Sequence, residues 1–236
     1  MKNKVASTTR FFWLYTLGAL LTISLAAIAA WADLEAAFYG FYQRGSEPVK
    51  GFYCPILMNK NEAGVVSLRI KNTTDKTLSP SVRMEFSTPG VAASDLRTIQ
   101  LSPGETRHLT WKISSENIDL KYFIFSKIFI YSFYPIPDSE GTCGTFIINV
   151  PIPGNVLLVL WVALGPGGIW GSLFLLRRTG SLSMQEKRAM RPLLFLGISL
   201  TLLLVLGLTG LWVQAVFLFA MSVLAIVVLM NYIFVK

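Results

Sequence analysis

The segment GVVSLRIKNTTDKTLSPSVRMEFS (residues 64–87) decides which fold class is expected for the middle of this chain. In residues 64–72 apolar side chains alternate with polar ones, and residues 81–87 repeat this pattern. Alternation with a period of two is typical of half-buried antiparallel strands. The polar residues 72–77 between the two halves favour a turn. The segment therefore predicts two antiparallel strands rather than a helix.

Further strands are expected on the C-terminal side of this segment. The stretches RHLTWKI (107–113) and TFIINV (145–150) alternate in the same way, and LSPGE (101–105) places Pro103 and Gly104 at the centre of a type II turn. No useful helical period occurs between Gly64 and Val150. Short strands separated by turns favour a β-sandwich.

The pattern VSLRIKNTTDKTLSPSVRMEF, followed by RTIQLSPGETRHLTWKI, resembles bacterial extracytoplasmic immunoglobulin-like domains of the CARDB type. In that family an N-x-T turn follows an early strand, and an L-x-P-G-E turn precedes a strand with an inward aromatic residue. The likeness covers about fifty residues, 65–113. It implies an immunoglobulin-like sandwich used for adhesion, spacing or docking, and no particular activity.

The remainder of the chain is too apolar for a water-soluble domain. Overall, 53% of the residues are hydrophobic and only 14% are charged, whereas soluble domains have about 25% charged residues. About 20 apolar residues are needed to cross a bilayer core. Four stretches of about this length contain no Asp, Glu, Lys or Arg: 11–32, 155–176, 192–210 and 211–235. We therefore expect a mixed membrane protein with four transmembrane helices and an all-β sandwich outside the membrane.

The net charge of +8 comes from residues beside these apolar stretches. Residues 32–153 contain twelve basic and twelve acidic side chains, so this region is neutral and no nucleic-acid partner is expected. Basic residues accumulate on the cytoplasmic side of membrane helices. The membrane-flanking basic residues are Lys2, Lys4, Arg10, Arg177, Arg178, Lys187, Arg188 and Arg191.

These clusters fall on one side of a membrane if the N-terminus and the C-terminus are both cytoplasmic. The protein is then a multi-pass protein of the cell membrane, with residues 33–153 extracytoplasmic. The expected organisation is an N-terminal anchor or signal peptide (1–32), the β-sandwich (33–153), a transmembrane helix (154–176), a basic cytoplasmic loop (177–191) and a transmembrane hairpin (192–236).

The first apolar stretch has two interpretations. Ala30, Trp31 and Ala32 precede Asp33 and fit a small-x-small cleavage site, which indicates a signal peptide. The stretch is longer than the usual 7–15 apolar residues of a signal peptide, which favours an uncleaved anchor. Cleavage would leave three transmembrane helices.

The segment KYFIFSKIFIYSFYPIP (121–137) is rich in aromatic residues on both faces of a strand. One interpretation is a central strand that is buried on both sides, and the other is an exposed surface that meets lipid or another subunit. The candidate interface residues are Phe123, Phe125, Phe129, Tyr131 and Phe133.

The apolar stretches contain no ionisable residue, which argues against a self-sufficient ion-coupled transporter and against a membrane-embedded hydrolase. In the second stretch, Ala163, Gly167 and Gly171 recur every four residues and form a stripe that suits close helix packing. We expect this stripe to pack against the hairpin of residues 192–235, or alternatively against another membrane subunit.

The two cysteines, Cys54 and Cys143, both lie in the region expected outside the cytoplasm, where thiols are commonly oxidised. We therefore expect a disulfide between them, with Met58 in the sandwich core. In the chain-entropy model, closing so long a loop contributes roughly 4–5 kcal/mol. A soft-metal site is disfavoured because His108 is the only histidine, and blue-copper sites need two. We expect no catalytic residue, no metal and no cofactor, and His108 is interpreted as a solvated surface residue.

The sequence supports three functional hypotheses of decreasing weight. The first is a non-enzymatic membrane protein whose extracytoplasmic domain serves binding or assembly at the cell surface. The second is an accessory subunit of a transporter, secretion or envelope complex, and the third is a membrane enzyme. The expected partners are the lipid bilayer and another membrane or envelope protein, and the sequence identifies no small-molecule ligand.

Overall fold

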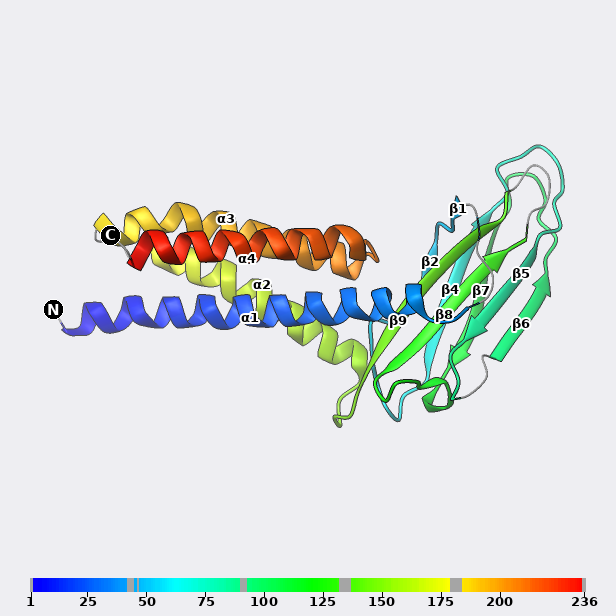
Figure 1. Cartoon of the computed structure of the whole chain (residues 1–236), viewed down its shortest axis with the longest axis horizontal. Helices are drawn as coiled ribbons and strands as arrows, with labels where there is room; N and C mark the ends of the chain where they lie inside the picture. Colours follow the sequence, from blue (N-terminus) through cyan, green and yellow to red (C-terminus); the bar gives the residue numbers. More distant parts are fainter. Residues whose placement is uncertain are drawn as a thin grey trace. The chain divides into compact units, whose positions relative to one another are not determined.

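The structure, a computed structural model, describes residues 2–41, 45, 47–89, 93–131, 137–178 and 184–234. The side chains of residues 2–9, 184–189 and 229–234 lie outside this description. The chain forms two compact units (Figure 1), Trp31–Leu157 and a second unit that combines Met1–Ala30 with Leu158–Lys236. Each unit has its own apolar core.

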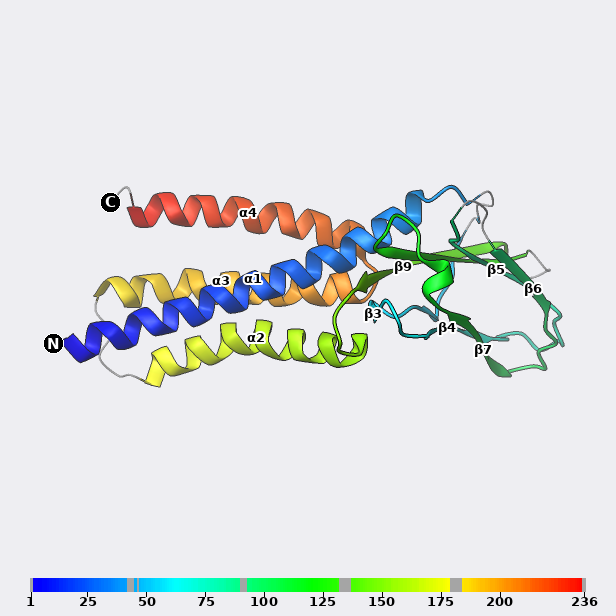
Figure 2. The ribbon, with the colours of Figure 1, turned by 90° about the horizontal axis from the view of Figure 1, so that it is seen from below.

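The unit Trp31–Leu157 is a sandwich of two β-sheets. The smaller sheet has the order β2-β4-β7 and the larger one β1-β9-β8-β5-β6, with β3 also paired to β9. Figure 2 shows β4 and β7 on one side of this unit and β9, β5 and β6 on the other. The strands are β1 (Glu47–Pro48), β2 (Phe52–Tyr53), β3 (Leu57–Asn59), β4 (Gly64–Lys71), β5 (Ser81–Phe86), β6 (Ala93–Thr98), β7 (Thr106–Ile113), β8 (Phe123–Ile130) and β9 (Ser139–Ile148), and a 3₁₀ helix, η1 (Ser115–Asn117), precedes β8.

The strand order is that of an immunoglobulin-like sandwich. The run β9-β8-β5-β6 corresponds to strands G, F, C and C′ of that fold, and β2-β4-β7 corresponds to A, B and E. Both β1 and β3 run parallel to β9, while the other pairs are antiparallel. The immunoglobulin-like sandwich expected from the sequence is confirmed.

The alternating apolar residues of the sequence form the core of the sandwich. In β4 and β7 the inward residues meet across the ladder, with Val66 opposite Trp111 and Leu68 opposite Leu109, and all four are buried. The predicted turn before β7 is also present. The amide of Glu105 donates to the carbonyl of Ser102 at 3.0 Å, and Gly104 has a φ of 73°, which a type II turn requires at this position.

A disulfide joins Cys54 to Cys143, with their Cα atoms 6.2 Å apart. Cys54 lies between β2 and β3 and packs against the core, while Cys143 belongs to β9. Met58 is buried in the same core, as predicted. The disulfide therefore connects the segment between β2 and β3 with the last strand of the sandwich.

The second unit contains most of four helices: α1 (Lys2–Phe38), α2 (Gly154–Arg178), α3 (Met184–Leu208) and α4 (Trp212–Phe234). Three segments are long and apolar enough to cross a membrane: Arg10–Phe38, Gly154–Arg178 and Met190–Leu208. The described apolar part of α4, Trp212–Val228, is shorter. By length and composition these helices are consistent with a membrane protein, and the count of four spans and their orientation stay predictions.

Within the helical unit, α1 and α2 approach closely through other glycines than those predicted. A Cβ atom at Gly18 would lie 2.7 Å from the carbonyl oxygen of Gly165, and one at Gly168 would lie 3.1 Å from the Cα of Gly18. A Cβ at Gly167 or Gly171 would meet nothing within 4 Å among the described residues. Among the described residues, α2 thus turns a different side toward its neighbours than the stripe of Ala163, Gly167 and Gly171. Packing of this stripe against another membrane subunit stays a prediction.

We predict that replacing both Cys54 and Cys143 by alanine lowers the free energy of unfolding by about 2–4 kcal/mol, because the cross-link no longer restricts the unfolded chain. Hydrogen exchange of the β4 and β8 amides in the solubilised chain would measure the loss. In the unmodified protein, alkylation should label two cysteines only after reduction. Two reactive thiols without reduction would contradict the disulfide.

Candidate functional site

The aromatic strand β8 lies at the centre of the larger sheet, between β9 and β5. Its inward side chains, including Ile124 and Ile128, belong to the sandwich core. Its outward side chains Phe125 and Phe129 are also buried. Phe125 and Phe129 are therefore covered as in a central strand, whereas Phe123 and Tyr131 are half-buried. An interface role for this segment stays a prediction. Phe133 lies outside the described residues.

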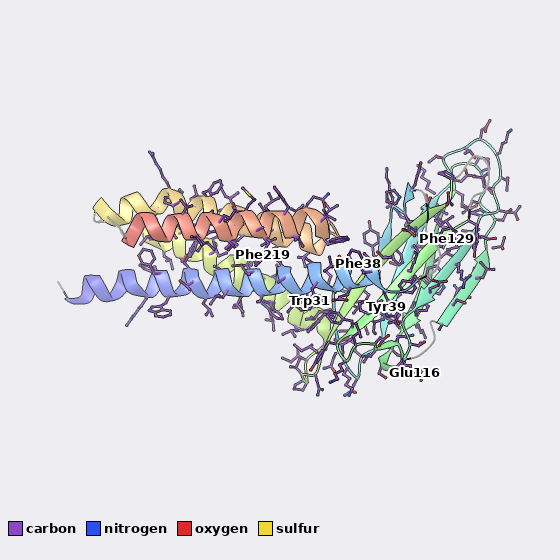
Figure 3. The ribbon with its side chains drawn as sticks, viewed as in Figure 1. Trp31, Phe38, Tyr39, Glu116, Phe129 and Phe219 are labelled. Atoms are coloured by element: carbon purple, nitrogen blue, oxygen red, sulfur yellow. A yellow bond between two sulfur atoms is a disulfide. The ribbon has the colours of Figure 1, made fainter. Side chains whose placement is uncertain are left out.

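The outward face of β8 is covered by the C-terminal end of α1 and the residues that follow it. Ala32 and Ala36 are completely buried. Tyr39 lies just beyond the end of α1, beside the sandwich (Figure 3), and its ring is 4.7 Å from that of Phe125. Gly144, opposite Phe125 on β9, has no room for a Cβ atom because it would overlap the backbone of Ala32. The amide of Gly144 donates to the Asp33 carboxylate at 3.0 Å. A glycine in the sheet thus lets the helix lie directly on the strand.

Tyr39 ties the end of α1 to the turn before β8. Its hydroxyl donates to the Asp119 carboxylate at 2.6 Å, and the same carboxylate accepts the amide of Leu120 at 2.7 Å. Burial raises the pKa of Tyr39 to about 12, with a further contribution from Asp119. Leu120 and Lys121 both have positive φ angles, of 47° and 70°, which non-glycine residues rarely adopt.

A buried cation lies beside this contact. The Lys127 ammonium group on β8 is 2.8 Å from the Glu140 carboxylate and 5.9 Å from the centre of the Phe41 ring. Glu140 also accepts the amide of Gly45 at 3.0 Å. The sequence places Lys127 among aromatic residues, but its partner is found only through the pairing of β8 with β9. The outward face of β8 is therefore covered, and its buried cation is paired with a carboxylate.

Residues 149–153 connect β9 to α2, and residues at the end of β3 and in the turn after it form hydrogen bonds with this connection and with the first residue of α2. The Asn59 amide group donates to the carbonyls of Val150 and, at 3.3 Å, of Ile152. The Glu62 carboxylate accepts the amides of Asn59 at 3.0 Å and of Gly154, the first residue of α2, at 2.8 Å. A carboxylate is favourable at a helix N-terminus because of the helix dipole.

The outer face of the smaller sheet is open. Its outward side chains on β4 and β7 include Arg69, Lys71, His108 and Lys112, all exposed, and the exposed Tyr53 of β2 lies beside Ser67. None of the outward residues on these three strands is a carboxylate. We name this surface, formed by Tyr53, Val65, Ser67, Arg69, Lys71, Thr106, His108, Thr110 and Lys112, the basic face.

A hollow of about 670 Å³ adjoins the basic face. It lies where the chain crosses from β1 to β2, and its polar lining includes Lys50, Arg69 and Lys71, one acidic residue, Glu47, and Thr73 and Ser139. Its apolar part includes Val49, Ile70, Ile130 and Pro137. The combination of an apolar floor and a few polar groups is typical of ligand sites, which measure about 300–1,000 Å³.

His108 lies on the basic face directly opposite Arg69. The predicted exposure of this histidine is confirmed. Among the described residues, no three His, Cys, Asp or Glu side chains come together in a way that could hold a metal ion. The alternation of the sequence already assigned Arg69, Lys71, His108 and Lys112 to outward positions. That β4 pairs with β7, which gathers them on one surface, was not predictable from the sequence.

Comparison with known proteins gives no family model and no curated protein that matches this chain. Among solved structures, the chain is similar to the CARDB domain of the PF1109 protein from Pyrococcus furiosus, determined in complex with di-metal ions. The identity is 13%, the TM-score is 0.35, and the match covers 47% of this chain and 100% of that domain. A solution structure of the same domain matches at 14% identity and a TM-score of 0.32, over 42% of this chain and 91% of that one.

A β-glucuronidase from Bacteroides uniformis is also similar, at 12% identity and a TM-score of 0.32. That match covers 41% of this chain and only 12% of the enzyme. CARDB domains are thus among the structures that this chain resembles. The assignment of the fold rests on the strand order, and no activity follows from these similarities.

We predict that Gly144→Ala destabilises the sandwich by about 1–3 kcal/mol, because the added methyl group meets the backbone of Ala32 and overpacks the contact. Gly40→Ala is the matched control, since a Cβ there meets nothing within 4 Å. Hydrogen exchange of residues 31–38 and of β9 would report the change. Equal exchange in the two variants would contradict the close packing of α1 on β9.

We predict that Tyr39→Phe lowers stability by about 0.5–1.5 kcal/mol at neutral pH through loss of the hydrogen bond to Asp119. The pKa of Tyr39 is about 12 in the folded state and near 10 when unfolded. The stabilising contribution of its protonated form is therefore complete below pH 10 and is lost as the pH rises through 12.

The stability difference between the unmodified protein and Tyr39→Phe should therefore shrink between pH 10 and pH 12. Tyr53→Phe serves as the control, because this tyrosine is exposed. Urea unfolding at several pH values measures the difference. A difference that stays constant over this range would show that Tyr39 does not titrate as described.

Proposed function

We propose that this chain is a non-enzymatic integral membrane protein whose immunoglobulin-like domain serves binding or assembly at the cell surface. The observation that carries the proposal is how the sandwich holds the two chain segments that continue into apolar helices. Ala32 and Asp33 of α1 contact Gly144 of β9, and Glu62 accepts the first amide of α2. Such contacts suit a domain that is held at a membrane and presented from it.

The same contacts favour an uncleaved N-terminal anchor. The helix α1 is continuous from Lys2 to Phe38, so it passes through the candidate cleavage site after Ala32 without a break. Ala32 is completely buried, and the small residue at this position is explained by packing on Gly144. A signal peptidase needs its site accessible and extended, which this packing opposes. We propose that α1 remains part of the mature protein, with residues 33–153 outside the cytoplasm.

Two modified chains test this topology. Glu116→Cys places a thiol on the exposed helix η1 of the sandwich, and Arg177→Cys places one at the end of α2. A membrane-impermeant maleimide should label the first variant in intact cells and the second only after permeabilisation. The reverse pattern would overturn the proposed orientation.

A tag at the N-terminus tests retention of the anchor, because it should stay attached and resist alkaline extraction from membranes. Affinity purification from native membranes after cross-linking then tests the binding role. We expect a specific partner to be retained. A chain that runs as a lone monomer and cross-links to nothing would contradict binding or assembly, whatever its topology.

A further inference from the structure

The basic side chains of the sandwich strands fall into two groups. Four of them pair with carboxylates at 2.7–2.8 Å: Arg83 with Glu85, Arg97 with Asp95, Arg107 with Glu105 and Lys127 with Glu140. Within the described residues, Arg69, Lys71 and Lys112 of the basic face form no such pair. Residues 32–153 hold as many acidic as basic side chains. The basic face is therefore left positive although carboxylates are as numerous as cations in this region.

The spacing of these cations indicates the shape of what they bind. Arg69 and Lys71 are two residues apart on β4, about 7 Å along the strand. Lys112 lies opposite Val65, four residues from Arg69 in the other direction. The row of positive charge therefore extends over about 20 Å. A single small anion cannot reach across this row, whereas an extended polymer with repeated anionic groups can.

The surroundings of Arg69 favour sugar units in such a polymer. The exposed Tyr53 and Arg69 both line the hollow, together with Thr73, Ser139 and one acidic residue, Glu47. A tyrosine offers an apolar ring face and a polar hydroxyl at once, which suits a sugar ring. A guanidinium group binds a carboxylate through two parallel hydrogen bonds.

We infer that the basic face and the adjoining hollow bind an acidic polysaccharide. Carboxylates of the polymer lie on Arg69, Lys71 and Lys112, and a sugar ring lies against Tyr53 at the mouth of the hollow. The inference names a class of partner for the proposed binding role. It rests on the proposed function only in one respect, namely that the polymer is encountered outside the cytoplasm.

Two other partners fit this surface less well. The centres of protein interfaces are depleted of charge and rich in aromatic residues, but the large apolar side chains exposed here are only Tyr53 and Val65. Anionic membranes attract clusters of four to eight lysines and arginines, whereas Arg69, Lys71 and Lys112 are spread along this face and only Lys50 of the hollow adds to them. The face therefore favours a polysaccharide over an acidic protein or a lipid surface.

The test measures binding of polygalacturonate to the full-length protein in nanodiscs of neutral lipid, with dextran as the uncharged control. We expect binding of polygalacturonate alone, weakening as salt is added because exposed charges are screened. The double variant Arg69→Gln, Lys71→Gln should bind at least tenfold more weakly. The charge-matched double variant Lys60→Gln, Arg107→Gln should bind within twofold of the unmodified protein, because neither residue belongs to the basic face.

Tyr53→Ala separates sugar recognition from charge. It should weaken binding of polygalacturonate severalfold and leave any weak binding of polyphosphate unchanged. The inference is overturned if dextran binds equally well, if both double variants lose the same affinity, or if polyphosphate or phosphatidylglycerol vesicles bind in place of polygalacturonate. Binding to nanodiscs does not depend on orientation in cells, so its failure is distinct from failure of the maleimide test.

Discussion

The absence of a side chain at Gly144 is the constraint on which the sandwich unit depends. It lets the backbone of Ala32 lie directly on β9 and lets the Gly144 amide reach Asp33. The end of α1 then covers the outward face of β8, where Phe125 is fully buried and its ring lies 4.7 Å from that of Tyr39. A strand that is apolar on both faces can exist in the larger sheet because this helix end removes its second face from water.

The two faces of the sandwich are consequently of different kinds. On the larger sheet the outward face of β8 is covered, and Lys127 on this strand is paired with Glu140, whereas the edge strand β6 is exposed. The smaller sheet has an outward face with exposed cations and no carboxylate. Burying an unpaired charge is costly whereas exposing one is not, so only an exposed face can keep cations free for a partner. Because the end of α1 packs on the larger sheet, binding is proposed on the open face of the smaller sheet.

The apolar helices pack by a related principle. Gly18 approaches Gly165 and Gly168 so closely that side chains there would collide. The hydroxyl of Tyr15 donates to the carbonyl of Leu193 at 2.8 Å, and the indole of Trp161 donates to the carbonyl of Leu21 at 3.0 Å. Small residues and single polar groups of this kind hold helices together where water offers no competing hydrogen bonds.

Local chemistry in the sequence was sufficient for much of this structure. The alternation of residues 64–71 and 106–113 predicts strands and their inward sides, because side chains in a strand point to alternate faces. Pro103 and Gly104 predict their turn, because few residues suit its backbone angles. The pairing of Cys54 with Cys143 follows from the presence of only two cysteines. The long apolar helices are predicted from the length of the apolar stretches, which matches the thickness of a bilayer core.

Only the tertiary structure decided which surfaces meet. A period of two shows that Arg69 and His108 point outward, but it does not show that β4 pairs with β7 and brings them side by side. The same period shows that Phe125 points away from Ile124, but it does not show that the end of α1 covers Phe125. In α2 the sequence shows several small residues, yet only the packing selects Gly165 and Gly168 over Gly167 and Gly171. Each of these contacts joins residues far apart in the chain, and such contacts are chosen by the packing of the whole unit rather than by any local pattern.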